Sequence, residues 1–331
     1  MGREISENLY ESAMEISSRD DLSELEKIAV LIQFAMKLQE RPKSEKQLEQ
    51  AISLYDRALE VLSDDNALDN ARVRFYRATA LQQLPGGTAE MLAQCLSELR
   101  QCVSVLEASG EAEEAGSAHM TIGLFIQALA SEQAANISDA IKHYQKALIV
   151  FRKESYPREH AILQNNLATA YLSMPITDDK AKMREALAVQ AFQSALSVIT
   201  LEEHPNEYAM LHNNLGNALQ YSTSAHILEN NFRALEAYQE ALRVRTVHTS
   251  PQTYANTIAN KANCLRNLPD DPDDLAKGNP GRLAEALLLY NEARQIFLEQ
   301  GESEKAEILN GTISEIEEEL AQMEDGSPAK H

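Results

Sequence analysis

The 331-residue sequence contains no tryptophan, only three cysteines, 12 glycines and 10 prolines. A chain that is poor in glycine and proline and rich in alanine and leucine is typical of an all-helical protein. Cys95 and Cys102 are two helical turns apart, about 10 Å along a helix axis, which is too far for a disulfide. Both stand where other copies of the repeat described below carry alanine, so we interpret them as small core residues in a reducing compartment.

Long hydrophobic runs are also absent. No stretch approaches the roughly 20 apolar residues that would span a bilayer. The N-terminus, MGREISENLYE, is charged and has no hydrophobic segment of the secretory type. We therefore predict a cytoplasmic protein without a membrane partner.

Local motifs of cofactor and metal chemistry are missing as well. There is no P-loop and no GxGxxG, and the eight histidines form no HExxH pair. Most of these histidines fall on expected surface or cap positions. Asp270, Asp271, Asp273 and Asp274 lie in a loop (268–281) that lacks EF-hand spacing, so we interpret it as a solvated loop. We predict no cofactor, no metal site and no catalytic residues, although a Ser-His-Asp triad would leave no local signature.

Basic residues are outnumbered, with 30 Lys and Arg against 51 Asp and Glu and a formal net charge of −21. Such a surface repels nucleic acid and anionic membranes. It favours a basic partner, or it serves only solubility, and the sequence leaves both interpretations open. We predict a protein or peptide partner and no nucleic acid, and we make no prediction of the oligomeric state.

What the sequence does have is a repeat. Pro157, Pro205 and Pro251 are 48 and then 46 residues apart, and a sequence stretch that follows each proline recurs with nearly the same spacing. Fixed periods of this size indicate a stack of supersecondary units, which more often presents an extended binding surface than a catalytic pocket. The three copies are AILQNNLATAYL (161–172), AMLHNNLGNALQ (209–220) and, more faintly, NTIANKANCLRN (256–267).

Each repeat has the pattern of two amphipathic helices. The second helix carries Ala-x3-aromatic-x2-Ala-Leu, a spacing that places the two small residues and the ring on one face. The first helix carries a small residue near its middle, where a partner helix can approach. The second-helix motif begins at Ala51, Ala140, Ala188 and Ala234, and the first-helix small residues are Ala78, Gly123, Ala168, Gly216 and Ala262.

We count six helix pairs within residues 21–300. A capping helix within residues 1–20 precedes them, a second capping helix covers 301–324, and we expect residues 325–331 to be disordered. The predicted first helices are 21–40, 67–84, 114–131, 158–174, 206–221 and 252–268, and the second helices are 44–62, 88–108, 136–153, 182–200, 228–246 and 281–299.

The Pro-x3-Ala-x3-NNLA/G stretch followed by Ala-x3-Tyr/Phe-x2-Ala-Leu resembles the tetratricopeptide repeat (TPR) superfamily in its long-repeat variety. It is similar to the repeats of kinesin light chains and to bacterial arrays found beside CHAT peptidase domains. The repeats are longer than usual, the excess falling in the loop between paired helices, and the array leaves no room for a peptidase domain. The resemblance implies a right-handed α-solenoid whose first helices line the concave face, and a protein-binding scaffold.

If the small residue faces its paired helix, the positions three before, one after and four after it share another face. In the second half of the chain this stripe is rich in amides, which can pair with both N–H and C=O of an extended peptide. In kinesin light chains, concave asparagines hold peptide cargo, so the resemblance favours the same use here. No lysine lies on the stripe, which disfavours capture of a C-terminal carboxylate. The predicted peptide-binding residues are Asn165, Thr169, Asn213, Asn217, Gln220, Asn263 and Arg266, followed by Asn166, Asn214, Asn256, Asn260 and Gln127.

An alternative assigns the second asparagine of each pair, Asn166 or Asn214, to backbone groups in the adjoining turn. For the whole chain, we predict a non-enzymatic scaffold or adaptor that binds a peptide segment or partner protein in its concave groove. Two alternatives are a regulatory subunit that wraps a folded partner enzyme and an enzyme with a site between repeats.

Overall fold

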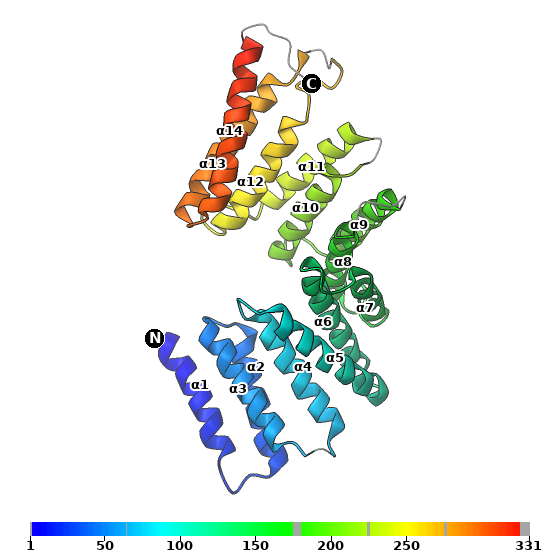
Figure 1. The fold of residues 1–331 in the computed structure, drawn as a ribbon, viewed down its shortest axis with the longest axis vertical. Helices are drawn as coiled ribbons and strands as arrows, with labels where there is room; N and C mark the ends of the chain where they lie inside the picture. The colour runs from blue at the N-terminus through cyan, green and yellow to red at the C-terminus, as the bar shows by residue number, and fades with distance from the viewer. Residues whose placement is uncertain (1, 64, 175–179, 224–225, 275–276, 325–331) are drawn as a thin grey trace. The chain divides into compact units, whose positions relative to one another are not determined.

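The structure, a computed structural model, consists of α-helices connected by turns and loops (Figure 1). Its described residues form fourteen α-helices and no strand, which confirms the predicted all-α solenoid. None of these helices has both the length and the hydrophobicity to cross a bilayer. The predicted disordered tail, 325–331, lies outside the described part of the chain. The described residues are 2–63, 65–174, 180–223, 226–274 and 277–324.

The chain divides into two compact units, Met1–Ser155 (unit 1) and Tyr156–His331 (unit 2). Each unit contains three helix pairs and one additional terminal helix. The helices of unit 1 are α1 (Gly2–Ser17), α2 (Glu24–Glu40), α3 (Glu45–Val61), α4 (Ala67–Gln83), α5 (Ala89–Ser109), α6 (Ala112–Ser131) and α7 (Ile137–Val150). The helices of unit 2 are α8 (Pro157–Leu172), α9 (Ala181–Leu196), α10 (Pro205–Gln220), α11 (Ile227–Leu242), α12 (Pro251–Arg266), α13 (Pro280–Glu299) and α14 (Ser303–Glu324).

Proline starts the first helices of unit 2, as predicted. Pro157, Pro205 and Pro251 are the first residues of α8, α10 and α12. The fixed φ of proline suits the first turn, where its missing N–H would have no helical partner. These starts fix the register of the first helices, and thereby which side chains share a face.

Close contact between a small residue and a ring joins the two helices of a pair. Tyr238 of α11 is fully buried against α10. A Cβ atom added to Gly216 would lie 2.6 Å from Cε1 of the Tyr238 ring, so no larger residue fits without displacement. The same relation joins Gly123 of α6 to Tyr144 of α7. The small residue therefore faces the second helix, as the sequence pattern predicts.

Within each unit, first helices of successive pairs contact one another. Apart from α1, which also touches α3, the alternate helices with substantial contact are first helices: α2 with α4, α4 with α6, and α10 with α12. Among the described helix pairs, first helices thus approach one another across the stack, and we call the face on which they do so the inner surface.

The second helices α7, α9 and α11 end three to four residues earlier than predicted, at Val150, Leu196 and Leu242. Phe151 and Ile199 follow two of these ends and are almost completely buried, so they prolong the apolar pattern into the turn. Part of the extra repeat length therefore lies between pairs, at 151–156, 197–204 and 243–250, and not only within pairs as predicted.

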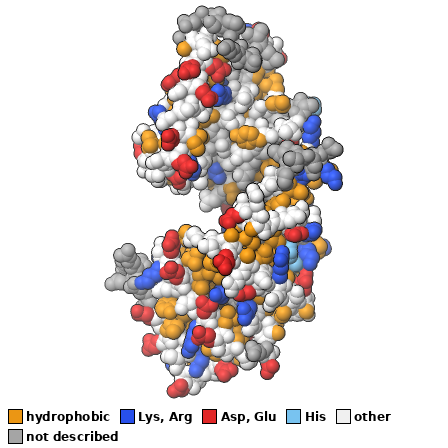
Figure 2. All heavy atoms as spheres, in the orientation of Figure 1, with side chains coloured by type: hydrophobic (Ala, Val, Ile, Leu, Met, Phe, Trp, Pro, Cys, Tyr) orange, Lys and Arg blue, Asp and Glu red, His pale blue; other side chains and the backbone are white. Residues whose placement is uncertain are grey.

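All three cysteines are buried and free, which confirms the interpretation of Cys95 and Cys102 as small core residues. Charged side chains are distributed rather than segregated. On the face drawn in Figure 2, acidic and basic side chains are interspersed over unit 1. On this face of unit 1, the net negative charge is therefore not gathered into one patch.

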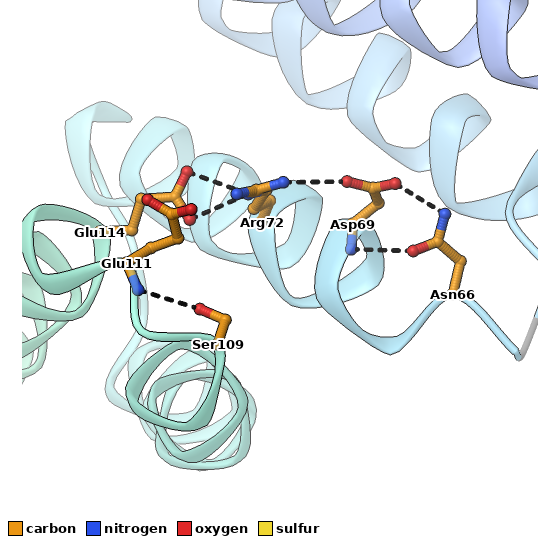
Figure 3. Close-up of polar contacts among 6 residues, drawn as sticks. All are labelled: Asn66, Asp69, Arg72, Ser109, Glu111 and Glu114. Atoms are coloured by element: carbon orange, nitrogen blue, oxygen red, sulfur yellow. Dashed lines mark hydrogen bonds and ion pairs between the residues drawn. The ribbon is translucent and has the colours of Figure 1, made fainter.

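A charged contact joins α4 to α6 in unit 1 (Figure 3). Arg72 Nε donates to both carboxylate oxygens of Glu114, at 2.9 Å each, and Arg72 Nη1 lies 3.3 Å from Asp69 Oδ1. Asn66 caps α4 by accepting from the backbone N–H of Asp69 at 3.3 Å. Because both first helices meet at one guanidinium, the contact sets their relative position near the helix starts.

Candidate functional site

An asparagine ladder runs across the first helices of unit 2. Asn214 Nδ2 of α10 donates to Asn165 Oδ1 of α8 at 2.9 Å, and Asn165 Nδ2 lies 3.2 Å from Asn166 Oδ1. Asn165 is only 9% exposed. The structure therefore places this side chain between the helices and not on the inner surface, where the stripe geometry predicts it. The second asparagine of the pair contacts a neighbouring side chain and not the backbone of a turn.

The ladder continues to α12. Asn213 is 8% exposed, and its Oδ1 accepts from Thr257 Oγ1 at 3.1 Å and from Asn260 Nδ2 at 3.5 Å. Its Nδ2 lies 3.5 Å from Asn214 Oδ1. Asn213 is thus also an interior residue. The first asparagines of the repeat connect α8, α10 and α12 in the interior, beneath the inner surface.

Two predicted contact residues meet the core tyrosine of their own pair. The Tyr238 hydroxyl lies 2.7 Å from Asn217 Oδ1 and 2.7 Å from Gln220 Oε1, and burial raises the pKa of this tyrosine. A hydroxyl carries one proton, so only one of the two amides can accept it. Gln220 Nε2 is buried and has no hydrogen-bond partner among the residues that the structure describes, so rotating this amide would let it donate to the tyrosine oxygen and leave the proton for Asn217.

The glutamine–tyrosine contact recurs in unit 1. Tyr144 donates to Gln127 Oε1 at 2.9 Å, and Tyr55 donates to Gln39 Oε1 at 2.9 Å. Gln127 lies four residues after Gly123, and Gln39 lies four residues after Ala35, a fully buried residue that takes the place of the small residue in α2. Gln127 therefore has a structural contact, and it belongs to unit 1, whereas the other predicted site residues belong to unit 2.

The remaining predicted residues lie on the partly exposed side of α8 and α12. Asn263 Nδ2 donates to the Tyr221 hydroxyl at 2.8 Å, and Arg266 Nη1 forms a 3.0 Å ion pair with Glu315 of α14. The Thr169 hydroxyl donates to the backbone carbonyl of Asn166 at 2.9 Å. Asn256 and Asn260 are half-buried on α12.

A cavity of about 230 Å³ opens between the C-terminal ends of α8 and α10 and the N-terminal end of α9. Of the predicted residues only Asn217 lines it. Leu172 and Tyr221 at this cavity are 38% and 65% exposed, which is high for large apolar and aromatic side chains beside a cavity. The full lining consists of Tyr171, Leu172, Met174, Ala181, Arg184, Glu185, Asn217, Ala218 and Tyr221.

Unit 1 has a cavity of about 510 Å³ between α2 and α4. It is lined by Lys37, Glu40 and several amides, and Gln39 Nε2 at this cavity donates to Thr79 Oγ1 at 2.9 Å. The two cavities use corresponding positions of the first helices. The surface open to a ligand is therefore formed by residues one, four and five positions after the small residue, and the position three before it lies inside the ladder.

A histidine pair in unit 1 is not anticipated by the sequence pattern. His119 Nδ1 of α6 lies 2.9 Å from His143 Nδ1 of α7, and His119 Nε2 lies 2.9 Å from Glu107 Oε1 of α5. Lys146 Nζ lies 3.3 Å from the same oxygen. Burial lowers the pKa of His119, and burial together with the nearby His119 lowers the pKa of His143 to about 4.

His119 is 4% exposed, so it departs from the surface or cap position expected for most histidines. His119 and His143 are 24 positions apart on two consecutive helices, so no short sequence motif contains both. A 440 Å³ cavity between α5, α6 and α7 borders this group. In the described part of the chain, no cluster of three or more His, Cys, Asp or Glu side chains could hold a metal ion.

Two aspartates of the acidic loop (268–281) make defined hydrogen bonds. Both Asp270 carboxylate oxygens accept backbone N–H groups at the start of α13, from Gly281 at 2.7 Å and Arg282 at 2.8 Å. Asp271 Oδ2 accepts from Lys277 at 2.7 Å. Residues 275–276 lie outside the described part of the chain. The first aspartate of this loop is thus a helix-capping residue and not only a solvated one.

No family model matches the chain, and no curated protein matches it. Among solved structures, the Rap conjugation gene regulator of plasmid pLS20 in complex with the Phr* peptide is 12% identical, with a TM-score of 0.51 over 95% of this chain and 81% of that chain. A Rap protein complexed with competence and sporulation factor is 15% identical, with a TM-score of 0.48 over 94% and 80%. The TPR2AB domain of yeast Sti1 is 17% identical, with a TM-score of 0.26 over 86% and 99%.

The likeness to the pLS20 regulator concerns the fold. Together with the helix pairs described above, it shows that the chain has a fold of stacked helix pairs, an α-solenoid, in common with that regulator.

Proposed function

We propose that the protein is a non-enzymatic adaptor that binds an extended peptide segment of a partner protein on the first-helix surface of unit 2. The observation that carries this proposal is the arrangement of Asn217. Its Oδ1 accepts from Tyr238 and it lines an open cavity, and within the described part of the chain its Nδ2 makes no hydrogen bond, so it can donate to a ligand. A fixed amide donor beside an apolar cavity suits a peptide carbonyl next to a nonpolar side chain.

The predicted residues divide into two groups in this proposal. Asn217, Thr169, Asn263 and Arg266 contact the peptide. The others act as positioning residues, because their amides belong to the ladder or, for the two glutamines, meet a core tyrosine; Asn217 has the same contact with a tyrosine but also lines the unit 2 cavity. The positioning residues are Asn165, Asn166, Asn213, Asn214, Asn260, Gln220 and, in unit 1, Gln127, and Asn256 is assigned to neither group.

The comparison supports a peptide as the ligand class. The pLS20 regulator, which has the same fold over most of its length, has the Phr* peptide in its complex. We extend the proposal to the finer features that the sequence indicates: kinship with kinesin-light-chain or CHAT-associated repeats, a continuous solenoid over residues 21–300 between capping helices, and a cytoplasmic location. In this proposal the acidic surface serves solubility, and the peptide need not be basic.

The test uses a peptide selected from a random display library on the full chain, with affinity measured by fluorescence anisotropy. Asn217→Asp keeps an oxygen for Tyr238 and removes the Nδ2 donor. We expect the peptide affinity to fall about tenfold or more, since a donor is replaced by an anion facing a carbonyl. The melting temperature should change little.

Asn206→Asp is the matched control, because it adds the same charge to the exposed start of the same helix. Its peptide affinity should equal that of the unchanged protein. Equal affinities for both variants, or failure to select any peptide, would contradict the proposed function.

A further inference from the structure

The cavities of the two units occupy the same place in the repeat. Each lies between two successive first helices and is lined by the residue four after the small residue of one helix and by the residues one and five after the small residue of the next. A position shared by both units is a property of the repeat and not of one loop. The corresponding residues are Gln39, Thr79 and Gln83 in unit 1 and Leu172, Asn217 and Tyr221 in unit 2.

The two cavities differ in chemistry. In unit 1 the first of these positions is an amide, and Gln33 and Gln83 add two more, whereas each cavity has one cationic and one anionic side chain in its lining. In unit 2 the same position is Leu172, and Tyr171 and Met174 continue an apolar wall. Exposed apolar groups of this size around a concavity are typical of a surface that another molecule covers.

The two charged side chains that line the unit 2 cavity are hydrogen-bonded within the protein or buried. Glu185 Oε2 accepts from the Ser222 hydroxyl at 3.2 Å and from the Thr223 backbone N–H at 2.9 Å, and Arg184 is only 7% exposed. The stretches 161–172 of α8 and 209–220 of α10 contain no Asp, Glu, Lys or Arg. A charged side chain entering here would lose hydration and meet charges of both signs, from Arg184 and Glu185, so attraction to one is offset by repulsion from the other and the cavity is complementary to an uncharged group.

The rim is held in a fixed geometry. The Tyr221 hydroxyl accepts from Asn263 Nδ2 of the next first helix at 2.8 Å, which orients an otherwise exposed ring. Asn217, one turn earlier on the same helix, is fixed by Tyr238. The volume of about 230 Å³ exceeds the cavity of about 150 Å³ that accommodates a benzene ring in a protein interior.

We infer that the unit 2 cavity is a selectivity pocket that receives one uncharged aromatic or branched aliphatic side chain of an extended partner peptide. Asn217 Nδ2 donates to a backbone carbonyl of that peptide beside the pocket. The inference rests on the proposed function for the peptide, and it adds the side-chain class that the partner must present.

The test needs no natural partner, because single blocked amino acids serve as probes. Methyl-labelled full-length protein is titrated with N-acetyl-L-tryptophanamide, N-acetyl-L-leucinamide and N-acetyl-L-lysinamide, and methyl NMR shifts are recorded. We expect the tryptophan and leucine probes to shift the methyl signals that surround the cavity, and the lysine probe at equal concentration to leave them unchanged. The reporting methyl groups are those of Leu172, Met174, Ala181 and Ala218.

Ala181→Phe fills the cavity from the first residue of α9, and the tryptophan probe should then bind at least fivefold more weakly. Ala89→Phe is the matched control, since Ala89 is the half-buried first residue of α5 in unit 1. Its titration should match that of the unchanged protein. If Ala181→Phe disturbs folding by circular dichroism, Leu172→Ser tests the same wall by removing its apolar group.

Equal shifts with the lysine probe, or shifts confined to other methyl groups, overturn the inference. So does a dimer, measured by light scattering, that Ala181→Phe converts to a monomer, because the occupant would then be a second copy of the chain. The proposed function fails independently, through the library selection and Asn217→Asp. If the probes bind but no peptide can be selected, the pocket is supported and the proposed adaptor function is refuted.

Discussion

Each helix pair depends on a residue that leaves space for its neighbour. Gly216 is the clearest case, because a Cβ atom there would lie 2.6 Å from the ring of Tyr238. The tyrosine is fully buried and holds Asn217 through its hydroxyl. The absence of a side chain at one position therefore determines where a surface amide points.

Gly216→Ala should lower the free energy of unfolding by about 1–3 kcal/mol, as overpacking does in a close-packed core. The ring would have to move, and the hydrogen bond to Asn217 with it. Urea unfolding followed by circular dichroism measures the stability, and peptide affinity should fall in the same variant.

Gly311→Ala is the control. Gly311 lies within α14, and an added Cβ would meet nothing within 4 Å. The same substitution should there stabilise the protein by about 0.5–1 kcal/mol through the better helix propensity of alanine. Destabilisation of similar size at both glycines would show that contact with the tyrosine is not the cause.

The histidine pair of unit 1 makes stability depend on pH. Only one proton fits between His119 Nδ1 and His143 Nδ1, and Lys146 and Arg100 add positive charge near the pair. The pKa of His143 is about 4 in the folded protein against 6.5 ordinarily. Between these values the unfolded chain binds more protons, so stability is complete above pH 6.5 and is lost as the pH falls towards 4.

His143→Asn should flatten this dependence, because the amide keeps a donor for His119 and does not titrate. We expect the loss between pH 6.5 and 4.5 to shrink by on the order of 1–2 kcal/mol, after allowance for solvent screening. Thermal melts across this range measure it. The same change at the exposed His248 should leave the profile unaltered, and parallel profiles for all three proteins would refute the role of the pair.

At the scale of helices, the asparagine ladder joins α8, α10 and α12. Asn213 is its centre, with Thr257 and Asn260 bonded to one oxygen and Asn214 beside its nitrogen. Asn213→Ala should therefore lower the free energy of unfolding by about 1–3 kcal/mol, because buried polar partners lose their contacts. An exposed groove residue would show no such loss.

A double-mutant cycle separates the ladder from general packing. Asn165→Ala and Asn214→Ala remove the two ends of one 2.9 Å bond, and their coupling in urea unfolding should be about 1 kcal/mol. Asn165→Ala and Asn260→Ala share no contact in the ladder, so this pair should be additive. Additivity in both cycles would mean that the ladder does not link the helices.

The starts of the helices could be predicted from the sequence because proline and the small residues act within one helix. The ends of α7 and α9 could not, since Phe151 and Ile199 have the same apolar period whether they continue a helix or anchor a turn. The burial of Asn165 could not be predicted either, for another reason. A helical wheel gives the face turned to the paired helix, whereas burial of this residue depends on α10, a neighbour that the wheel does not contain.

At the scale of the molecule, the two units have the same construction and different surfaces. Both place a cavity between successive first helices, and each cavity has one cationic and one anionic residue in its lining, but amides line much of the cavity in unit 1 and apolar or aromatic side chains much of the cavity in unit 2. The repeat predicts where such cavities occur, because it fixes the register. It does not predict their chemistry, which is carried by the variable residues four and five positions after the small residue.

The net charge of −21 and the uncharged first-helix stretches of unit 2 lead to opposite predictions of how peptide affinity depends on salt concentration. If peptide recognition uses amides and an apolar pocket, the affinity of a selected peptide should change less than about threefold between 50 and 500 mM NaCl, because neutral hydrogen bonds and apolar contacts are not screened. If the acidic surface captures a basic partner, the affinity should fall about tenfold or more, mainly through slower association. Stopped-flow association at both salt concentrations distinguishes the two. We expect the first result, since the charges at the unit 2 cavity are internally bonded or buried and those of unit 1 are interspersed on the face in Figure 2.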